Sequence, residues 1–83
     1  MKIRIQYIHK VSPRYETDRE VVDGSVTDLT DLDSVRRLLK RHKQECPNSE
    51  HDRQETDEEG KKRFVLFPRR SIWHSIIVSE ETP

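Results

Sequence analysis

The chain has 83 residues, of which 39% are charged and 30% are hydrophobic, and its formal net charge at pH 7 is zero. A chain of this length fits one small domain with a thin margin of stability, and the zero net charge argues against a general binder of polyanions. The lone Cys46 excludes an internal disulfide, and no apolar run approaches the roughly 20 residues of a membrane span.

The amino-terminal sequence and the single cysteine also indicate a cellular compartment. The first residues, Met-Lys-Ile-Arg-Ile-Gln, alternate charged or polar with apolar side chains and do not form a signal peptide. A protein without disulfides fits a reducing environment. We therefore expect a cytoplasmic protein with no membrane partner.

Two strands are predicted at the start of the chain. Apolar residues alternate with polar ones over 2–10, and this period of two indicates a strand with one buried face. A more polar strand follows over 14–22. If Val11–Pro13 forms a three-residue loop, Ile3 lies opposite Val21. A shift of one residue would set Ile5 beside Glu20 on conflicting faces, and register normally follows the face that must be buried, so we expect the Ile3–Val21 pairing.

An amphipathic helix is predicted over about 31–43. Thr30 is the expected N-cap, with Asp33 three residues later in a capping-box-like position. Apolar residues recur at helical spacing on one side only, so the helix should lie against one face of a sheet. That side consists of Leu32, Val35, Leu38, Leu39 and His42.

The segment after the helix is polar and acidic. No apolar residue occurs over 48–62, which predicts a polar mobile loop at about 47–62, with a short polar strand around 53–56 as the alternative. Its acidic part, residues 50–59, could dock onto a basic partner or mimic a nucleic-acid backbone. Residues 80–83 are expected to form a short tail.

The remaining stretch, residues 62–79, predicts a β-hairpin. Two runs of β-branched and aromatic residues flank a polar tetrad that contains Pro68. The predicted order is therefore strand, strand, helix, strand, strand. This makes one α+β domain over residues 1–83, with the helix on one face of a sheet of about four strands. At the level of element order it resembles ubiquitin-like β-grasp domains. The chain lacks the terminal Gly-Gly of the conjugated members, so the resemblance implies no activity and no site.

The carboxy-terminal hairpin also carries the main functional expectation. With Phe67 opposite Ile72, both of its faces are apolar, and a strand that is apolar on both faces needs cover on both. One short helix covers one face, so the other should meet a partner, unless the two hairpins close on each other. We therefore expect a small, non-enzymatic protein–protein interaction module that forms a homodimer or binds or inhibits another protein. The expected contact residues are Trp73, Phe64, Leu66, Ile77, Arg69 and Arg70.

A nucleic-acid-binding protein is the first alternative. The polar side of the predicted helix is basic, and phosphates attract such patches. The opposing interpretation is an ordinary solvated helix surface. The basic side consists of Arg36, Arg37, Lys40, Arg41 and Lys43.

Catalysis and metal binding find weaker support. A small nuclease-like enzyme is a second alternative, because histidines can transfer protons during RNA cleavage, but no spacing joins any two of the candidate groups. His42, Cys46 and His51 are suitable zinc ligands, yet a structural site needs a fourth ligand, and none is evident nearby. We therefore expect no enzyme activity, no metal and no cofactor. The nuclease candidates are His9, His51, His74, Arg69 and Arg70.

Overall fold

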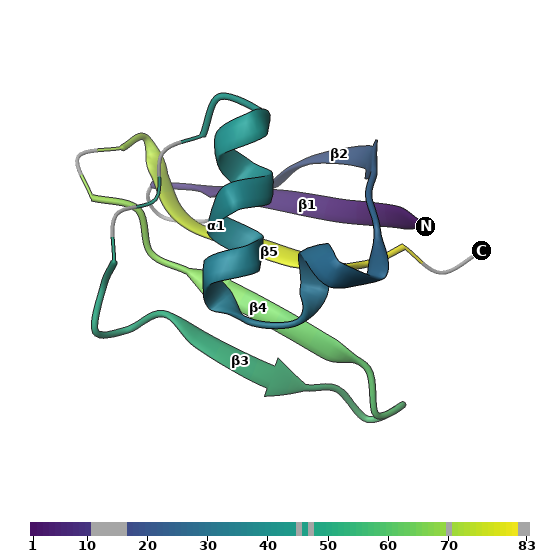
Figure 1. Ribbon diagram of the computed structural model, residues 1–83. Coiled ribbons are helices and arrows are strands. Elements are labelled where there is room, and N and C mark those ends of the chain that lie inside the picture. Colours follow the sequence, from purple (N-terminus) through teal and green to yellow (C-terminus); the bar gives the residue numbers. More distant parts are fainter. Residues whose placement is uncertain (11–16, 45, 47, 70, 82–83) are drawn as a thin grey trace.

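Five antiparallel strands form one sheet in the order β2-β1-β5-β4-β3, and a single helix covers one of its faces (Figure 1). The structure is a computed structural model that describes residues 1–10, 17–44, 46, 48–69 and 71–81. The predicted α+β class is confirmed. The elements are β1 (Lys2–His9), β2 (Thr17–Asp23), the 3-10 turn η1 (Val26–Leu29), α1 (Leu32–Arg41), β3 (Arg53–Thr56), β4 (Lys62–Leu66) and β5 (Trp73–Glu80).

The sheet has one strand more than the expected four or so. Arg53–Thr56 pairs antiparallel with β4 as strand β3. The prediction of a loop over the whole of 47–62 is therefore wrong, and the alternative of a short polar strand around 53–56 is confirmed. Its sequence has no apolar side chain because it is an edge strand, and cross-strand ion pairs replace hydrophobic burial. The likeness to β-grasp domains remains one of element order.

The predicted register of the first hairpin is wrong by one residue. The structure pairs Ile3 with Val22 and Ile5 with Glu20, the arrangement that the sequence argument rejected. Glu20 is accommodated on the core side because its carboxylate accepts a hydrogen bond of 2.6 Å from the Tyr7 hydroxyl. The observed register also places Val22 against the core, whereas Val21 and the other side chains of this edge strand are exposed.

The register of the second hairpin also differs from the expectation. Phe64 pairs with Val78 and Leu66 with Ile76, so these four side chains share the face that packs under the helix. The connection between the strands, residues 67–72, is longer than a tight turn, and the pairing of β1 with β5 contains an irregularity between Ile8 and His9. A bulge of this kind changes which side chains face the core, and alternation alone does not locate it.

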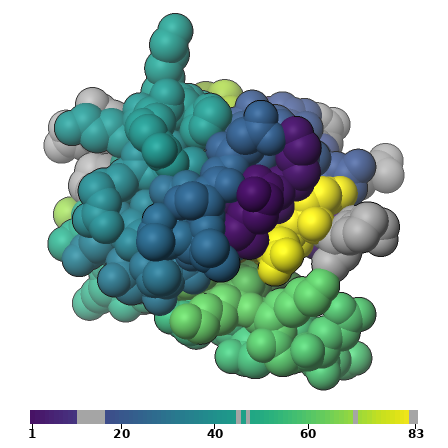
Figure 2. Space-filling model, turned by 45° about the vertical axis from the view of Figure 1, so that its right-hand side comes forward, coloured from purple at the N-terminus to yellow at the C-terminus, as the bar shows by residue number. Residues whose placement is uncertain are grey.

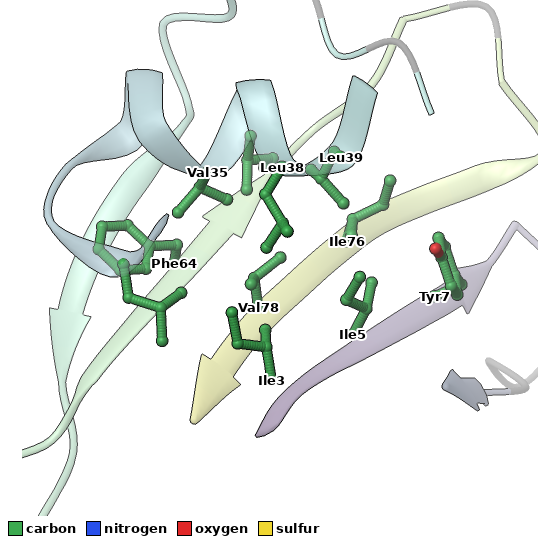
Figure 3. Close-up of a cluster of buried hydrophobic side chains, with 11 residues drawn as sticks. Ile3, Ile5, Tyr7, Val35, Leu38, Leu39, Phe64, Ile76 and Val78 are labelled. Atoms are coloured by element: carbon green, nitrogen blue, oxygen red, sulfur yellow. The ribbon is translucent and has the colours of Figure 1, made fainter. Parts of the chain in front are cut away.

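The hydrophobic core lies between α1 and the sheet. Val35, Leu38 and Leu39 on the helix are fully buried, and Figure 3 shows them directed at the side chains of β1, β4 and β5. The sheet contributes Ile3, Ile5, Tyr7, Phe64, Leu66, Ile76 and Val78 to this cluster.

The N-cap of the helix lies one residue later than predicted. Asp31, not Thr30, is the N-cap, and its Oδ1 accepts a hydrogen bond of 2.7 Å from the Ser34 backbone N–H. Thr30 instead ends η1. No helix in the described part of the chain is long and apolar enough to cross a membrane.

Candidate functional site

The face of the sheet turned away from α1, here called the open face, is the main candidate for function. Paired residues of neighbouring strands project to the same side of a sheet, so the register defines its rows. In the described residues, no helix lies against it. One row is Val21, Arg4, Ser79, Arg63 and Glu55, and the next is Arg19, Gln6, Ile77, Val65 and Arg53.

Apolar side chains run through the middle of the open face. Ile8 and Ile77 are half-buried, Val65 is buried, and Val21 on the edge strand is 46% exposed. Phe67 continues the strip beyond β4, and the Arg53 guanidinium lies 5.4 Å from its ring centroid. Arginine stems can cover apolar surface while their charged ends stay in water, and Arg53, which pairs with Val65, is placed to shield it in this way.

Basic side chains surround this apolar strip. The register places five cationic side chains on the open face against three carboxylates, so positive charge is in excess. Two of the arginines share one acid: Glu55 accepts a hydrogen bond of 2.6 Å from Arg53 Nε and also bonds with Arg63. The bonds from Arg53 and then Arg63 hold the pKa of Glu55 below its usual value. The cations are Lys2, Arg4, Arg19, Arg53 and Arg63, and the carboxylates are Asp23, Glu55 and Glu81.

A cleft of about 580 Å³ adjoins one end of the open face. It lies between the end of β5 and the β3–β4 turn, and Figure 2 shows the gap between these yellow and green segments. Arg4, Gln6, Arg63 and Ser79 line it from the sheet. The turn supplies the opposite wall, where Gly60 adopts a positive φ of 81°, a conformation that favours glycine.

Trp73 lies on the other side of the sheet, next to the core. Its ring centroid is 4.9 Å from that of Tyr7 and 4.6 Å from that of His9. His9 Nε2 is 2.9 Å from Asp18 Oδ2. A smaller cleft of about 290 Å³, lined in part by Trp73, Asp18 and Glu20, opens here. Burial, followed by the bond to Glu20, raises the pKa of Tyr7 above its usual value, so this hydroxyl acts as a hydrogen-bond donor.

The residues predicted to bind a partner are therefore split between locations. Phe64 and Leu66 are 0% exposed in the core, so the expectation that they lie on an uncovered face is wrong. The three-residue difference in hairpin register accounts for that error. Trp73 is half-buried beside them, whereas Ile77 lies on the open face. Arg69 is exposed, and Arg70 lies outside the described residues.

The basic side of the helix is less available than its sequence suggests. Arg36 donates to Asp33 at 2.9 Å and to Asp52 at 2.7 Å, and Arg41 donates to Asp28 at 2.8 Å. The remaining predicted nucleic-acid contacts, Arg37, Lys40 and Lys43, are exposed. Nucleic-acid binding through this face stays a prediction.

The candidate nuclease histidines lie in two places. His51 and His74 both contact the Phe67 ring edge-on, at centroid distances of 6.2 and 5.9 Å, whereas His9 contacts the Trp73 ring edge-on. Among the residues that the structure describes, no three or more His, Cys, Asp or Glu side chains gather as a metal site. Burial, together with the nearby Asp52 carboxylate, raises the pKa of the Cys46 thiol to about 11.

Sequence reasoning missed the two polar features that matter most here. Asp52, in the segment predicted to be a loop, is buried and joins the helix to the end of β4. Arg4 and Arg63 flank Ser79 only because three strands meet in one row. Alternation placed Arg4 on the polar side of its strand, but no sequence signal connects it with residues so distant in the chain.

Comparison with known protein families, with characterised proteins and with solved structures finds no match for this chain.

Proposed function

We propose that this protein is a non-enzymatic protein-binding module, and that its open face binds a protein surface with an apolar centre and acidic surroundings. The observation that supports this is the apolar strip of Ile8, Val65, Phe67 and Ile77, which no helix of the described chain covers. Apolar patches framed by polar groups commonly mark interaction sites. Arginine is also enriched among the residues that dominate binding energies.

The charge of the open face favours a different protein over a second copy of this chain. Two copies packed face to face would oppose two surfaces that both carry an excess of positive charge. Juxtaposed like charges disfavour an interface, whereas complementary charge speeds association and selects the partner. An acidic partner would meet Arg4, Arg19, Arg53 and Arg63 with opposite charge.

The test is a selection of random peptides displayed on phage, with the purified protein as bait. We expect the enriched peptides to combine apolar residues with Asp or Glu. Ile77→Lys should abolish binding of the enriched peptides, because it adds charge to the centre of the strip while leaving the core untouched. Lys40→Glu, on the outer side of the helix, is the matched control and should bind as the wild type does.

Three results would contradict the proposal. The first is the absence of enrichment, and the second is equal binding by wild type and Ile77→Lys. The third is a stable dimer in sedimentation that Ile77→Lys converts to a monomer, which would reassign the face to self-association. A labelled oligonucleotide serves as a parallel probe. Salt-sensitive binding that Lys40→Glu removes would favour the helix face and nucleic acid.

A further inference from the structure

Three polar atoms without hydrogen-bond partners gather at the end of the open face. They are Arg4 Nε, Ser79 Oγ and Glu81 Oε2, all of them buried. Ser79 as a whole is only 8% exposed. Buried polar groups in folded proteins are nearly always paired, so each exception needs an explanation. Three exceptions at one place indicate a site that is complete only when another group enters it.

The strand register places the donors of this site in one row. Ser79 pairs with Arg4 on β1 and with Arg63 on β4, so its hydroxyl lies between two arginines. Directly opposed residues in a sheet have Cβ atoms about 5 Å apart, so both guanidinium groups lie close to Ser79. Arg63 is already bonded to Glu55, which leaves Arg4 Nε and Ser79 Oγ as the donors for a ligand. All three residues line the cleft of about 580 Å³.

Glu81 forms only a long ion pair with Arg4. Its Oε2 is 3.5 Å from Arg4 Nε, which is within ion-pair range, yet neither atom has a hydrogen bond. Well-formed bonds between arginine and carboxylate are shorter, about 2.7–2.9 Å. The contact is therefore one that a better-placed carboxylate can replace.

The wall of the cleft limits the charge of the ligand. The β3–β4 turn and the end of β5 bring four acidic side chains to it, and these oppose the two arginines and the two lysines of the lining. These acids repel a ligand that carries one negative charge less than they repel a polyanion. The acidic lining residues are Asp57, Glu58, Glu59 and Glu80, and the lysines are Lys61 and Lys62.

We infer that the Arg4–Ser79–Arg63 row binds one carboxylate group of the partner polypeptide, and that Glu81 must leave for it to enter. The incoming carboxylate accepts hydrogen bonds from Arg4 Nε and Ser79 Oγ. This inference rests on the proposed function, because it names the group that the open face recognises in an acidic partner. Glu81 then acts as an internal competitor that weakens binding.

The test is a titration with acetate followed by ¹H–¹⁵N NMR of the intact protein, with chloride at equal ionic strength as the reference. The Arg4 Nε–H and Ser79 backbone N–H signals should shift and saturate with acetate only. Glu81→Gln should lower the Kd for acetate at least threefold, because it removes the competing charge. Arg4→Gln should abolish saturation, whereas Arg37→Gln, on the exposed side of the helix and outside the cleft, should not change it.

The inference is overturned if acetate causes no saturable shift in Glu81→Gln, or if Arg4→Gln binds acetate as well as the wild type does. Tighter binding of inorganic phosphate than of acetate at the same signals would overturn the assignment to a carboxylate. Failure here is separable from failure of the proposed function. If acetate binds but no peptides are selected, the carboxylate site stands and the proposed function fails. If peptides are selected but acetate does not bind, the proposed function stands and the carboxylate site fails.

Discussion

Asp52 joins three separate segments of the chain through one carboxylate. Its side chain is 1% exposed; Oδ2 accepts from Arg36 Nη2 at 2.7 Å and from the Ser49 N–H at 3.1 Å, and Oδ1 accepts from the Phe67 N–H at 2.8 Å. The helix, the segment before β3 and the end of β4 therefore depend on a single buried charge. A hydrophobic core alone would not fix these segments relative to one another, because the segment before β3 is polar.

Removal of that carboxylate should be costly. Asp52→Ala leaves the Arg36 guanidinium without its buried counter-charge, and breaking a buried ion pair on one side costs about 3–5 kcal/mol. We expect this decrease in the free energy of unfolding in urea titrations. The control is Asp33→Ala, which removes the exposed partner of the same arginine and should cost less than about 1 kcal/mol. Equal losses for the two variants would contradict the assigned role.

The thiol of Cys46 should react slowly in the folded protein. Burial raises its pKa from 9.0 to about 11, and the thiolate is the reactive form. At pH 8 we therefore expect alkylation by iodoacetamide to be about a hundredfold slower in the native protein than in urea, from the thiolate fraction alone. Similar rates in both conditions would show that the thiol is neither buried nor raised in pKa.

At the scale of single elements, the helix is the part that the sequence predicted best. Its apolar spacing identified Val35, Leu38 and Leu39 as core residues, and all three are fully buried. The strands were harder because their partners lie far away in the chain. The bulge near Trp73 and the hydrogen bond between Tyr7 and Glu20 both place side chains on a face that simple alternation does not predict. Neither feature leaves a signal in the local sequence.

The same limit explains why the predicted contact residues are divided between the two faces of the sheet. The expectation that one helix cannot cover both faces of the sheet identified Ile77, which lies on the open face. It misplaced Phe64 and Leu66, since the faces of a strand exchange whenever the register shifts by an odd number of residues. The arginines of the open face come from four strands, so only the folded sheet brings them together.

The helix cap offers a test at this scale. Asp31 accepts from the Ser34 N–H, and an N-cap side chain satisfies one of the free donors at a helix start. We expect Asp31→Ala to lower Tm by a few degrees in thermal unfolding followed by circular dichroism. Asp31→Asn should retain most of the stability, because the amide oxygen can also accept this bond. A larger loss in Thr30→Ala than in Asp31→Ala would support the cap that the sequence suggested.

For the whole molecule, stability should fall at both ends of the pH range. On the acid side, hydrogen bonds lower the pKa values of Asp28, Asp31 and Glu55 in the folded state; their largest causes are the Ser25 N–H, the Ser34 N–H and the Arg53 side chain. A group whose pKa is lowered by folding stabilises the folded state at pH values above its pKa in the unfolded chain. That unfolded pKa is 3.8 for the aspartates and 4.5 for Glu55. That contribution is lost as the pH falls further.

On the alkaline side, folding shifts the pKa values in the opposite direction. Folding raises the pKa of Cys46 from 9.0 to about 11 and also raises that of Tyr7 above 10.0. The stability linked to these groups is present below the unfolded values and is lost as the pH rises through the folded ones. Urea midpoints measured by Trp73 fluorescence should therefore be highest between about pH 5 and pH 9. A midpoint that does not change from pH 6 to pH 3 would contradict the acid part of this prediction.

The two outermost strands of the sheet, β2 and β3, are also its most polar ones. Outer strands expose unpaired backbone groups that can recruit further chains into fibrils, and charged side chains discourage such stacking. Asp18, Arg19 and Glu20 of β2 follow one another along the exposed strand. Replacing Arg19 and Asp23, whose side chains lie on the open face, with threonine should therefore turn a dispersed solution into one that binds thioflavin and scatters light, although the interior of the protein is unchanged.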